Sequence, residues 1–241
     1  LDDAIESAGR AGSTRVVLAP MFPQYASAST GTALAKAFAL LGRLPRVPDV
    51  SVVPPFFDDD GFLDSVASMI LEATNAKPVD HVLFSYHGLP LHQVQRIHPQ
   101  HCAGTDACCA TLTTQNASCY RAQCMATTRA LVARCDLGAG TYSTSCQSRL
   151  GKAVWLLPNT EHVLVELANK GVKKLAVACP SFTADCLETV EEIGVRARAT
   201  FTRAGGDELV FVPCVNARDS FVDVMARLIG RALGGEGGGK P

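Results

Sequence analysis

The sequence predicts an α/β fold in which parallel sheets are covered by helices. Three observations predict it. Short apolar runs of strand length alternate with stretches of helical periodicity, glycine directly follows one of those stretches, and 47% of the 241 residues are hydrophobic while 19% are charged. This alternation is typical of parallel sheets, because parallel strands are joined by helical crossovers. The composition is that of a globular protein with enough apolar residues for one large core or two small ones.

The expected elements follow one another in a regular order. Gly171 stands where a helix ends in a left-handed cap, just before an apolar strand. Between Pro90 and about Gln147 the pattern breaks down into a polar loop rich in cysteine and one helix. We place the cysteine-rich insertion at about 91–125 and a flexible glycine-rich tail at 234–241. The expected strands lie at 15–20, 50–53, 81–85, 174–179 and 208–212, and the expected helices at 33–44, 61–73, 120–134, 160–170, 188–204 and 220–233.

The charge distribution and the lack of targeting signals limit which partners and which location are expected. The formal net charge is -1 and the basic residues are spread along the chain, so no nucleic-acid partner is expected. No apolar stretch reaches the roughly 18 residues of a membrane span, and the N-terminus has no signal-peptide pattern. We therefore expect a cytoplasmic protein.

Two polar segments directly follow expected strands. Ser85-Tyr86-His87-Gly88-Leu89-Pro90 follows one, and Pro180 to Thr189 follows another. Ligands of open parallel sheets bind outside the carboxyl ends of the strands, so His87 and Glu188 should face one cleft. An isolated loop histidine is more often incidental than catalytic, and the position at a strand end favours the catalytic role without deciding it.

The other candidates have simpler explanations beside the functional one. Glu188 stands three residues after Asp185, which is the spacing of a helix capping box, and that spacing alone favours a cap. Cys186 and Phe182 fit a buried core as well as they fit a site. Trp155, the single tryptophan, is either a core residue or a flat surface for a planar ligand.

Ten cysteines are unusual for a chain of this composition, and five of them crowd into one segment. A disulfide scaffold would be spread more evenly, so the clustering indicates metal binding. Four thiolates suit a structural zinc or an iron-sulfur cluster, and the spacing slightly favours zinc. The clustered cysteines are Cys102, Cys108, Cys109, Cys119 and Cys124.

Several motifs together resemble the ferrochelatase family. Ser85 to Pro90 resembles its Ser-x-His-Gly-x-Pro motif, and Gln147 to Thr160 its Gln-Ser-(Arg/Lys)-x-Gly and Trp-Leu-x-Pro-x-Thr segment. Phe182 to Thr189 resembles its Phe-x-x-Asp-(His/Cys)-x-Glu-Thr motif. Three further stretches agree: Pro20 to Tyr25, Ser29-Thr30-Gly31, and Pro213 to Asn216. The resemblance covers nearly the whole chain apart from the cysteine segment.

The resemblance implies a chelatase-like fold of two Rossmann-like halves, at residues 1–74 and 75–241. The first half is expected to be incomplete, because the family's usual opening strand and porphyrin-facing loop have no counterpart before the Pro-Gln-Tyr stretch. We therefore expect an N-terminally truncated chain, whose own activity the sequence leaves open. Position 186 is Cys where many relatives carry His, which removes one potential metal ligand or proton carrier.

The resemblance also implies an activity. It indicates a lyase that inserts Fe²⁺ into protoporphyrin IX in haem biosynthesis, releasing two protons. Coproporphyrin III is the alternative substrate, and a non-catalytic iron-sulfur-binding fragment is the alternative from another class. His87 and Glu188 would be the catalytic residues and the ligands of the substrate Fe²⁺, one handling protons and the other metal. Peripheral membrane contact and oligomeric state stay open. The residues implied to bind porphyrin are Trp155, Phe182, Ser148, Arg149 and Asp185.

For the cysteine segment, the resemblance reverses the preference for zinc. A subset of bacterial-type ferrochelatases carries a [2Fe-2S] cluster on an internal cysteine loop at this place in the chain. The implied ligands are Cys102, Cys119, Cys124 and one of the pair Cys108 and Cys109. Iron insertion is redox neutral, so stability or sensing is the implied role of the cluster.

Overall fold

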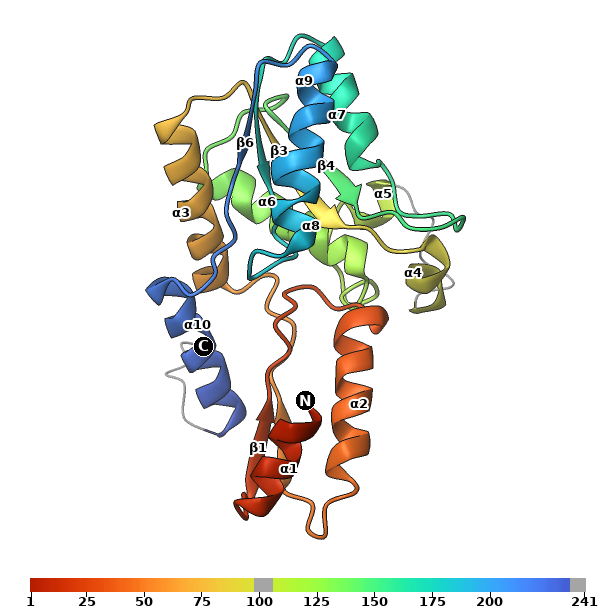
Figure 1. The fold of residues 1–241 in the computed structure, drawn as a ribbon, viewed down its shortest axis with the longest axis vertical. Coiled ribbons are helices and arrows are strands. Elements are labelled where there is room, and N and C mark those ends of the chain that lie inside the picture. The colour runs from red at the N-terminus through yellow and green to blue at the C-terminus, as the bar shows by residue number, and fades with distance from the viewer. Residues whose placement is uncertain (98–105, 235–241) are drawn as a thin grey trace.

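The computed structural model describes residues 1–97 and 106–234 (Figure 1). The strands are β1 (Arg15–Leu18), β2 (Asp49–Val52), β3 (His81–His87), β4 (Tyr142–Gln147), β5 (Lys174–Ala178) and β6 (Glu208–Phe211). The helices are α1 (Asp2–Arg10), α2 (Thr32–Leu41), α3 (Asp60–Ala76), α4 (Leu91–Ile97), α5 (Asp106–Cys109), α6 (Tyr120–Arg134), α7 (Thr160–Asn169), α8 (Leu187–Val190), α9 (Arg198–Arg203) and α10 (Asp219–Ala232), with π-helical turns η1 (Ser27–Gly31) and η2 (Glu192–Ala197).

The strands form two parallel sheets, which confirms the predicted fold class. In the described chain, β1 pairs with β2 in a two-stranded sheet, and the other strands form a four-stranded sheet in the order β4-β3-β5-β6. Every pairing is parallel. The strand order places β3 and β5 side by side at the centre of the larger sheet. Their carboxyl ends therefore open at the same edge.

The two faces of the larger sheet are covered by different helices because the side chains of β3 alternate. Leu83 packs into a cluster formed by α7, η2 and α9. Val82 and Phe84 pack into the cluster on the opposite face, which includes residues of α3 and α6. All three side chains are at most 2% exposed. Strands buried on both faces are continuously apolar, and this apolar run is why the sequence predicted β3. Figure 1 shows α3 on one side of this sheet and α7 and α9 on the other.

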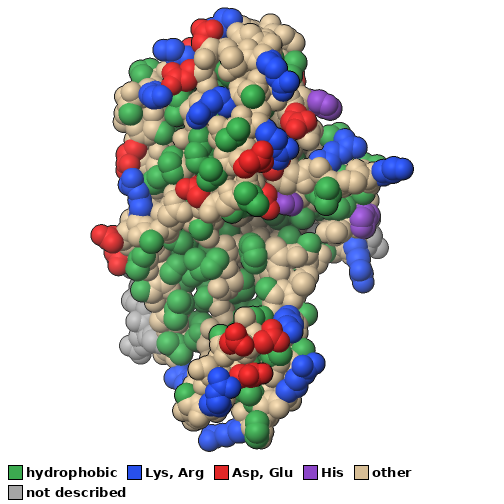
Figure 2. Space-filling model, viewed as in Figure 1, with side chains coloured by type: hydrophobic (Ala, Val, Ile, Leu, Met, Phe, Trp, Pro, Cys, Tyr) green, Lys and Arg blue, Asp and Glu red, His purple; other side chains and the backbone are tan. Residues whose placement is uncertain are grey.

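The smaller sheet has a core of its own. Ile5 of α1 and Leu40 and Leu41 of α2 are buried against side chains of β1 and β2. Hydrophobic side chains also gather between the part of the molecule that contains the larger sheet and the part that contains the smaller one (Figure 2). Acidic and basic residues are mixed over the rest of the visible surface.

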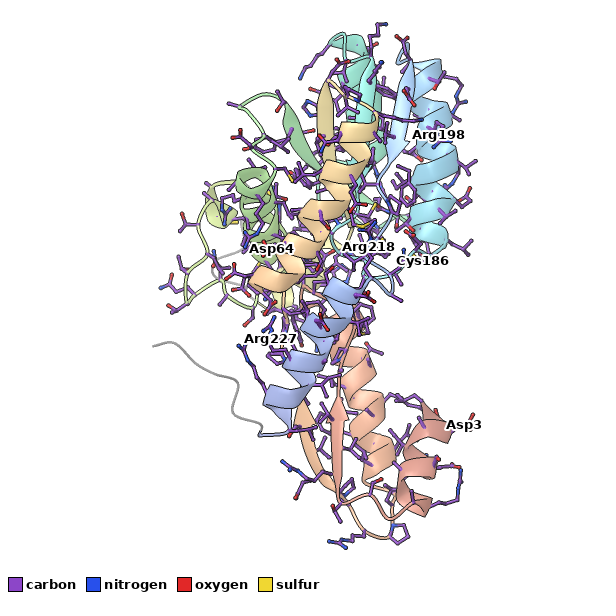
Figure 3. All side chains as sticks on the ribbon, turned by 90° about the vertical axis from the view of Figure 1, so that its left-hand side faces the viewer. Asp3, Asp64, Cys186, Arg198, Arg218 and Arg227 are labelled. Carbon is purple, nitrogen blue, oxygen red and sulfur yellow. The ribbon has the colours of Figure 1, made fainter. Side chains whose placement is uncertain are left out.

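Helix α10 runs from the larger sheet towards the smaller one (Figure 3). Its apolar residues join the α3 cluster, with Phe221 beside Phe56 and Phe62. Arg227 pairs with Asp59 at 2.6 Å, and the carbonyl of Leu233 accepts a hydrogen bond from Arg15 of β1. We propose that the two sheets mark the expected halves 1–74 and 75–241, with α10 returning to the first.

The expected strands and helices are present, with ends that differ by a few residues. The stretch between Pro90 and Gln147 differs most, because it contains β4, α4 and α5 besides the expected helix. Strand β4 reads Tyr-Ser-Thr-Ser-Cys-Gln and has no aliphatic residue to signal it. Its inward side chains Ser145 and Gln147 are buried as polar groups, bonded to Thr160 at 2.8 Å and to Ser85 at 2.7 Å.

The helix expected at 188–204 is α8, η2 and α9 in succession, and its predicted cap is wrong. Cys186 is the N-cap residue, and its main-chain N–H donates to the hydroxyl of Thr189 at 2.9 Å. The capping box therefore lies one residue later than the Asp185 and Glu188 pair. Along residues 1–97 and 106–234, every helix is too short or too polar to span a bilayer.

Candidate active site

The structure brings His87 and Glu188 together at the carboxyl ends of β3 and β5. Both residues line a cavity of about 290 Å³. Both also line a second cavity of about 550 Å³. The two cavities therefore share this pair of residues. The smaller cavity is lined by Phe22, Gln24, Ala26, Ala28, Ser29, Leu89, Tyr120, Ser181 and Phe182 in addition to the pair.

The main chain of His87 is held on both sides. Its N–H donates to the hydroxyl oxygen of Ser181 at 3.0 Å, and its carbonyl accepts from the phenol of Tyr120 at 2.7 Å. The next N–H, that of Gly88, donates to the carbonyl of Gln147 at 2.8 Å. The peptide between His87 and Gly88 is thus bonded at its N–H and at its carbonyl. These bonds set the direction in which the imidazole leaves the strand.

The imidazole has a defined proton arrangement. Nδ1 lies 2.6 Å from the carbonyl oxygen of Gly88. A carbonyl oxygen can only accept, so Nδ1 carries the hydrogen in the neutral ring and Nε2 presents a lone pair. That lone pair can take a proton or bind a divalent metal ion.

Gly88 is required by close approach rather than by a sharp turn. A Cβ at this position would lie 2.7 Å from the carbonyl oxygen of Gln147 and 3.2 Å from the ring of Trp155. Among the described residues, those with a positive φ angle do not include Gly88, so its backbone does not need a left-handed conformation. Glycine therefore allows the strand end, β4 and Trp155 to meet behind His87.

Glu188 is oriented by its main chain and kept ionised by its neighbours. Its carbonyl accepts from the side-chain amide of Gln147 at 2.6 Å. A hydrogen bond from the Cys186 thiol lowers the pKa of Glu188, with help from its own main-chain N–H, while burial opposes the shift. A carboxylate beside an imidazole with a free lone pair is a suitable acid-base and metal-binding pair.

Asp185 is engaged in loop structure rather than directed at the cavities. Its carboxylate accepts from the main-chain N–H of Cys214 at 3.0 Å and from the side chain of Asn216 at 2.8 Å. The Asp185 N–H donates back to the Asn216 side chain at 2.9 Å. These bonds join the loop after β5 to the loop after β6, and so they support the start of α8 and Glu188.

The other predicted porphyrin-binding residues divide between the two cavities. Phe182 lines the smaller one, with its ring centroid 6.1 Å from that of His87. Ser148, Arg149 and Trp155 line the larger one. Ser148 donates to the Glu192 carboxylate through both N–H and hydroxyl, each at 2.7 Å. Arg149 is exposed, and the partly exposed Trp155 donates its indole N–H to the carbonyl of Leu150 at 3.0 Å.

Tyr120, Ser181 and Gln24 line the smaller cavity, make hydrogen bonds there and were not predicted as site residues from the sequence. Gln24 is 2% exposed, and its amide donates to Thr127 at 3.1 Å and towards the Pro180 carbonyl at 3.4 Å. Its side-chain oxygen is buried without a hydrogen-bond partner at the smaller cavity. The Pro-Gln-Tyr motif was the one available signal for Gln24. Tyr120 and Ser181 carried no signal beyond lying near other motif residues.

The cysteine segment lies beside this site. Cys102 falls outside the described residues. The sulfur of Cys108 lies 3.6 Å from that of Cys109, and a hydrogen bond with Cys119 raises the pKa of Cys109, as does its burial. Burial also raises the pKa of Cys124, and Cys146 adds to that effect. Within residues 1–97 and 106–234, no group of three or more His, Cys, Asp or Glu side chains is arranged to hold a metal ion.

The chain is similar to known proteins of one family. A family model described as ferrochelatase matches residues 1–233. The ferrochelatase of Bdellovibrio bacteriovorus is 41% identical over 95% of this chain and 68% of its own length. That of Stutzerimonas stutzeri is 40% identical over 96% of this chain and 69% of its own. Among solved structures, SirB from Bacillus subtilis with Fe³⁺ superposes with a TM-score of 0.58 at 12% identity, over 99% of this chain and 79% of that one. The last comparison shows a shared fold.

Proposed function

This chain belongs to the ferrochelatase family, and from that premise we propose that it is a lyase that inserts Fe²⁺ into protoporphyrin IX to form protohaem. The observation that carries the proposal is that His87 and Glu188 line the same two cavities, with the imidazole presenting the Nε2 lone pair. Metal insertion must remove two pyrrole protons while the metal enters the ring. A neutral imidazole and an ionised carboxylate supply the base and the metal ligand that this reaction needs.

The porphyrin would bind across the mouth of these cavities. Phe182 and Trp155 offer flat apolar surfaces in the two cavities that His87 lines, and Arg149 offers a charge for a propionate. Ser148 contributes by holding Glu192 at the same rim. Asp185 contributes through the loop that presents Glu188. Packing the macrocycle against these side chains would exclude water from the reacting nitrogens.

Iron insertion into protoporphyrin under anaerobic conditions tests the assignment. We expect His87→Ala to lower the rate at least about 100-fold, because the loss of a general base has an effect of this order. His92→Ala, an exposed histidine of α4, is the matched control and should keep full activity. Activity that survives in His87→Ala would overturn the role of His87.

We also propose that four of the five thiols at Cys102, Cys108, Cys109, Cys119 and Cys124 hold a [2Fe-2S] cluster. The donor chemistry of the described residues supports this, because Cys109 contacts both Cys108 and Cys119, and Cys109 and Cys119 are buried. A hydrogen bond with Arg121 lowers the pKa of Cys109 and partly offsets the raising effects of Cys119 and burial. When bound, such a cluster would cross-link the segment to the start of α6.

The colour and metal content of the purified chain test the cluster. We expect a brown protein whose visible absorbance bleaches with dithionite, and whose absorbance is lost in Cys119→Ser but kept in Cys135→Ser. Cys135 lies at the other end of α6 and serves as the control thiol. A colourless protein with one bound zinc would favour the structural zinc instead.

A further inference from the structure

We propose that Tyr120 is a positioning residue for His87. We also propose that a change in the conformation of the cysteine segment alters the active site through Tyr120. Its phenol donates to the carbonyl oxygen of His87 at 2.7 Å. Tyr120 is 5% exposed and begins α6, directly after Cys119. It therefore lies between a thiol of the segment and the main chain of the histidine.

The bond acts on the imidazole through two consecutive peptide groups. The carbonyl of His87 accepts from Tyr120, and the N–H of the same peptide, that of Gly88, donates to the carbonyl of Gln147. The carbonyl of Gly88 then accepts from Nδ1 of the His87 ring at 2.6 Å. The Gly88 carbonyl belongs to the next peptide, and a change in φ at Gly88 that accompanies displacement of the His87–Gly88 peptide would move this carbonyl away from Nδ1. Tyr120 thus helps to decide which ring nitrogen carries the hydrogen.

The hydroxyl of Tyr120 is suited to a permanent donor role. A phenol has an ordinary pKa of about 10 and keeps its hydrogen at neutral pH. A phenol has only one hydrogen to donate, and the His87 carbonyl accepts it.

The same turn of α6 also contacts the loop that carries Gln24, another residue lining the smaller cavity. Gln123 accepts from the main-chain N–H of Tyr25 at 2.6 Å and donates to the carbonyl of Ala117 at 2.7 Å. Ala117 lies within the cysteine-rich stretch, and Tyr25 follows Gln24 at the smaller cavity. The first turn of α6 is therefore bonded to the cysteine segment, to His87 and to the loop carrying Gln24. A change in the conformation of the segment would therefore affect both His87 and the loop carrying Gln24 through these hydrogen bonds.

Tyr120→Phe, with Tyr86→Phe as its matched control, tests the inference on the full chain. Phenylalanine keeps the ring and its packing, and removes only the hydroxyl. The phenol of Tyr86 is also buried and also bonds α6, but through Thr128 at 2.8 Å and not through His87. Hence both variants lose one buried hydroxyl, and only one of them releases the His87 carbonyl.

Two readouts separate positioning from a general loss of structure. Long-range ¹⁵N NMR of labelled histidine, with the His87 signal assigned by its loss in His87→Ala, should show the Nδ1–H tautomer in the unaltered chain and in Tyr86→Phe. Tyr120→Phe should show a substantial Nε2–H fraction. In the iron-insertion assay, Tyr120→Phe should lower kcat by roughly tenfold while the Kd for protoporphyrin changes less than about twofold. Replacing Tyr120 by 4-aminophenylalanine, which restores a donor, should recover both.

The coupling to the cysteine segment has its own readout. Cys119→Ala should shift the His87 tautomer in the same direction as Tyr120→Phe, and should add little to it in the double variant, because both act through one bond. Additive shifts would overturn the coupling. A folded Tyr120→Phe with an unaltered tautomer and unaltered kcat would overturn the positioning role.

The kcat measurement rests on the proposed iron insertion, whereas the NMR measurement of the His87 tautomer does not. A chain that inserts no iron, yet shows the tautomer shift in Tyr120→Phe, would contradict the proposed function and support the positioning role.

Discussion

The main-chain N–H of His87 donates to Ser181 Oγ at 3.0 Å, which ties the carboxyl end of β3 to the loop that follows β5. These two segments carry the two residues of the proposed chemistry, since Glu188 lies farther along the second of them. The bond therefore does more than satisfy a buried polar group. It sets the spacing between the imidazole and the segment that presents the carboxylate.

Ser181→Ala should weaken this connection. The His87 N–H would lose its acceptor, at a cost of about 1–3 kcal/mol for an unsatisfied buried donor. We expect a lower melting temperature and a kcat for iron insertion reduced about tenfold. Ser68→Ala removes a hydroxyl that bonds only within α3 and should leave kcat unchanged. Equal rates in the two variants would contradict the role given to Ser181.

Gly88→Ala should disrupt the site by steric overlap. The new Cβ would lie 2.7 Å from the Gln147 carbonyl oxygen, and neither strand end can yield without moving the other. We expect a destabilisation of about 1–3 kcal/mol by thermal unfolding, together with a large loss of activity. Gly230→Ala is the matched control in α10, where a Cβ meets nothing within 4 Å. That change should stabilise the chain by about 0.5–1 kcal/mol through helix propensity.

Cys186→Ala should raise the pKa of Glu188. The thiol hydrogen bond is the largest cause of the lowered pKa, and alanine removes it. An NMR titration of the side-chain carboxyl carbons should show the Glu188 midpoint moving up towards the ordinary range. Cys135→Ala, whose buried thiol faces the Ala67 carbonyl, should leave that midpoint in place. A Glu188 titration unaffected by Cys186→Ala would show that the thiol does not hold the carboxylate.

Asp80→Asn should flatten the acid side of the stability profile. The main-chain N–H groups of Lys174 and Lys173 donate to the Asp80 carboxylate and lower its pKa. A carboxyl whose pKa is lower when folded stabilises the chain above its unfolded pKa of about 3.9, and this stabilisation is lost as the pH falls through the folded value. The variant should therefore be less stable at pH 6, by less than about 1 kcal/mol because Asp80 is exposed, and the difference should vanish near pH 2. Urea unfolding at a series of pH values measures it, and a difference independent of pH would contradict this explanation.

The predictability of each element follows from how it is buried. Strands β3 and β5 lie inside the sheet with both faces covered, so their apolar runs identified them directly. Strand β4 is an edge strand whose buried side chains are one hydroxyl and one amide, and nothing in its composition separates it from a loop. The cap of α8 was misplaced by one residue, because a capping box needs only a polar side chain at the right distance and two pairs satisfied that spacing.

The sequence by itself determined the fold class, the family and the expectation that His87 and Glu188 follow strand ends and face one cleft, because each of these depends on local pattern and motif order. Only the tertiary structure decided how those residues are held. Tyr120, Ser181 and Gln147 reach the His87 region from three separate segments, and Asp185 turned out to bond Asn216 rather than line a cavity. Hydrogen bonds between distant segments depend on which side chains the packed core brings within about 3 Å, and neither periodicity nor spacing along the chain encodes that distance.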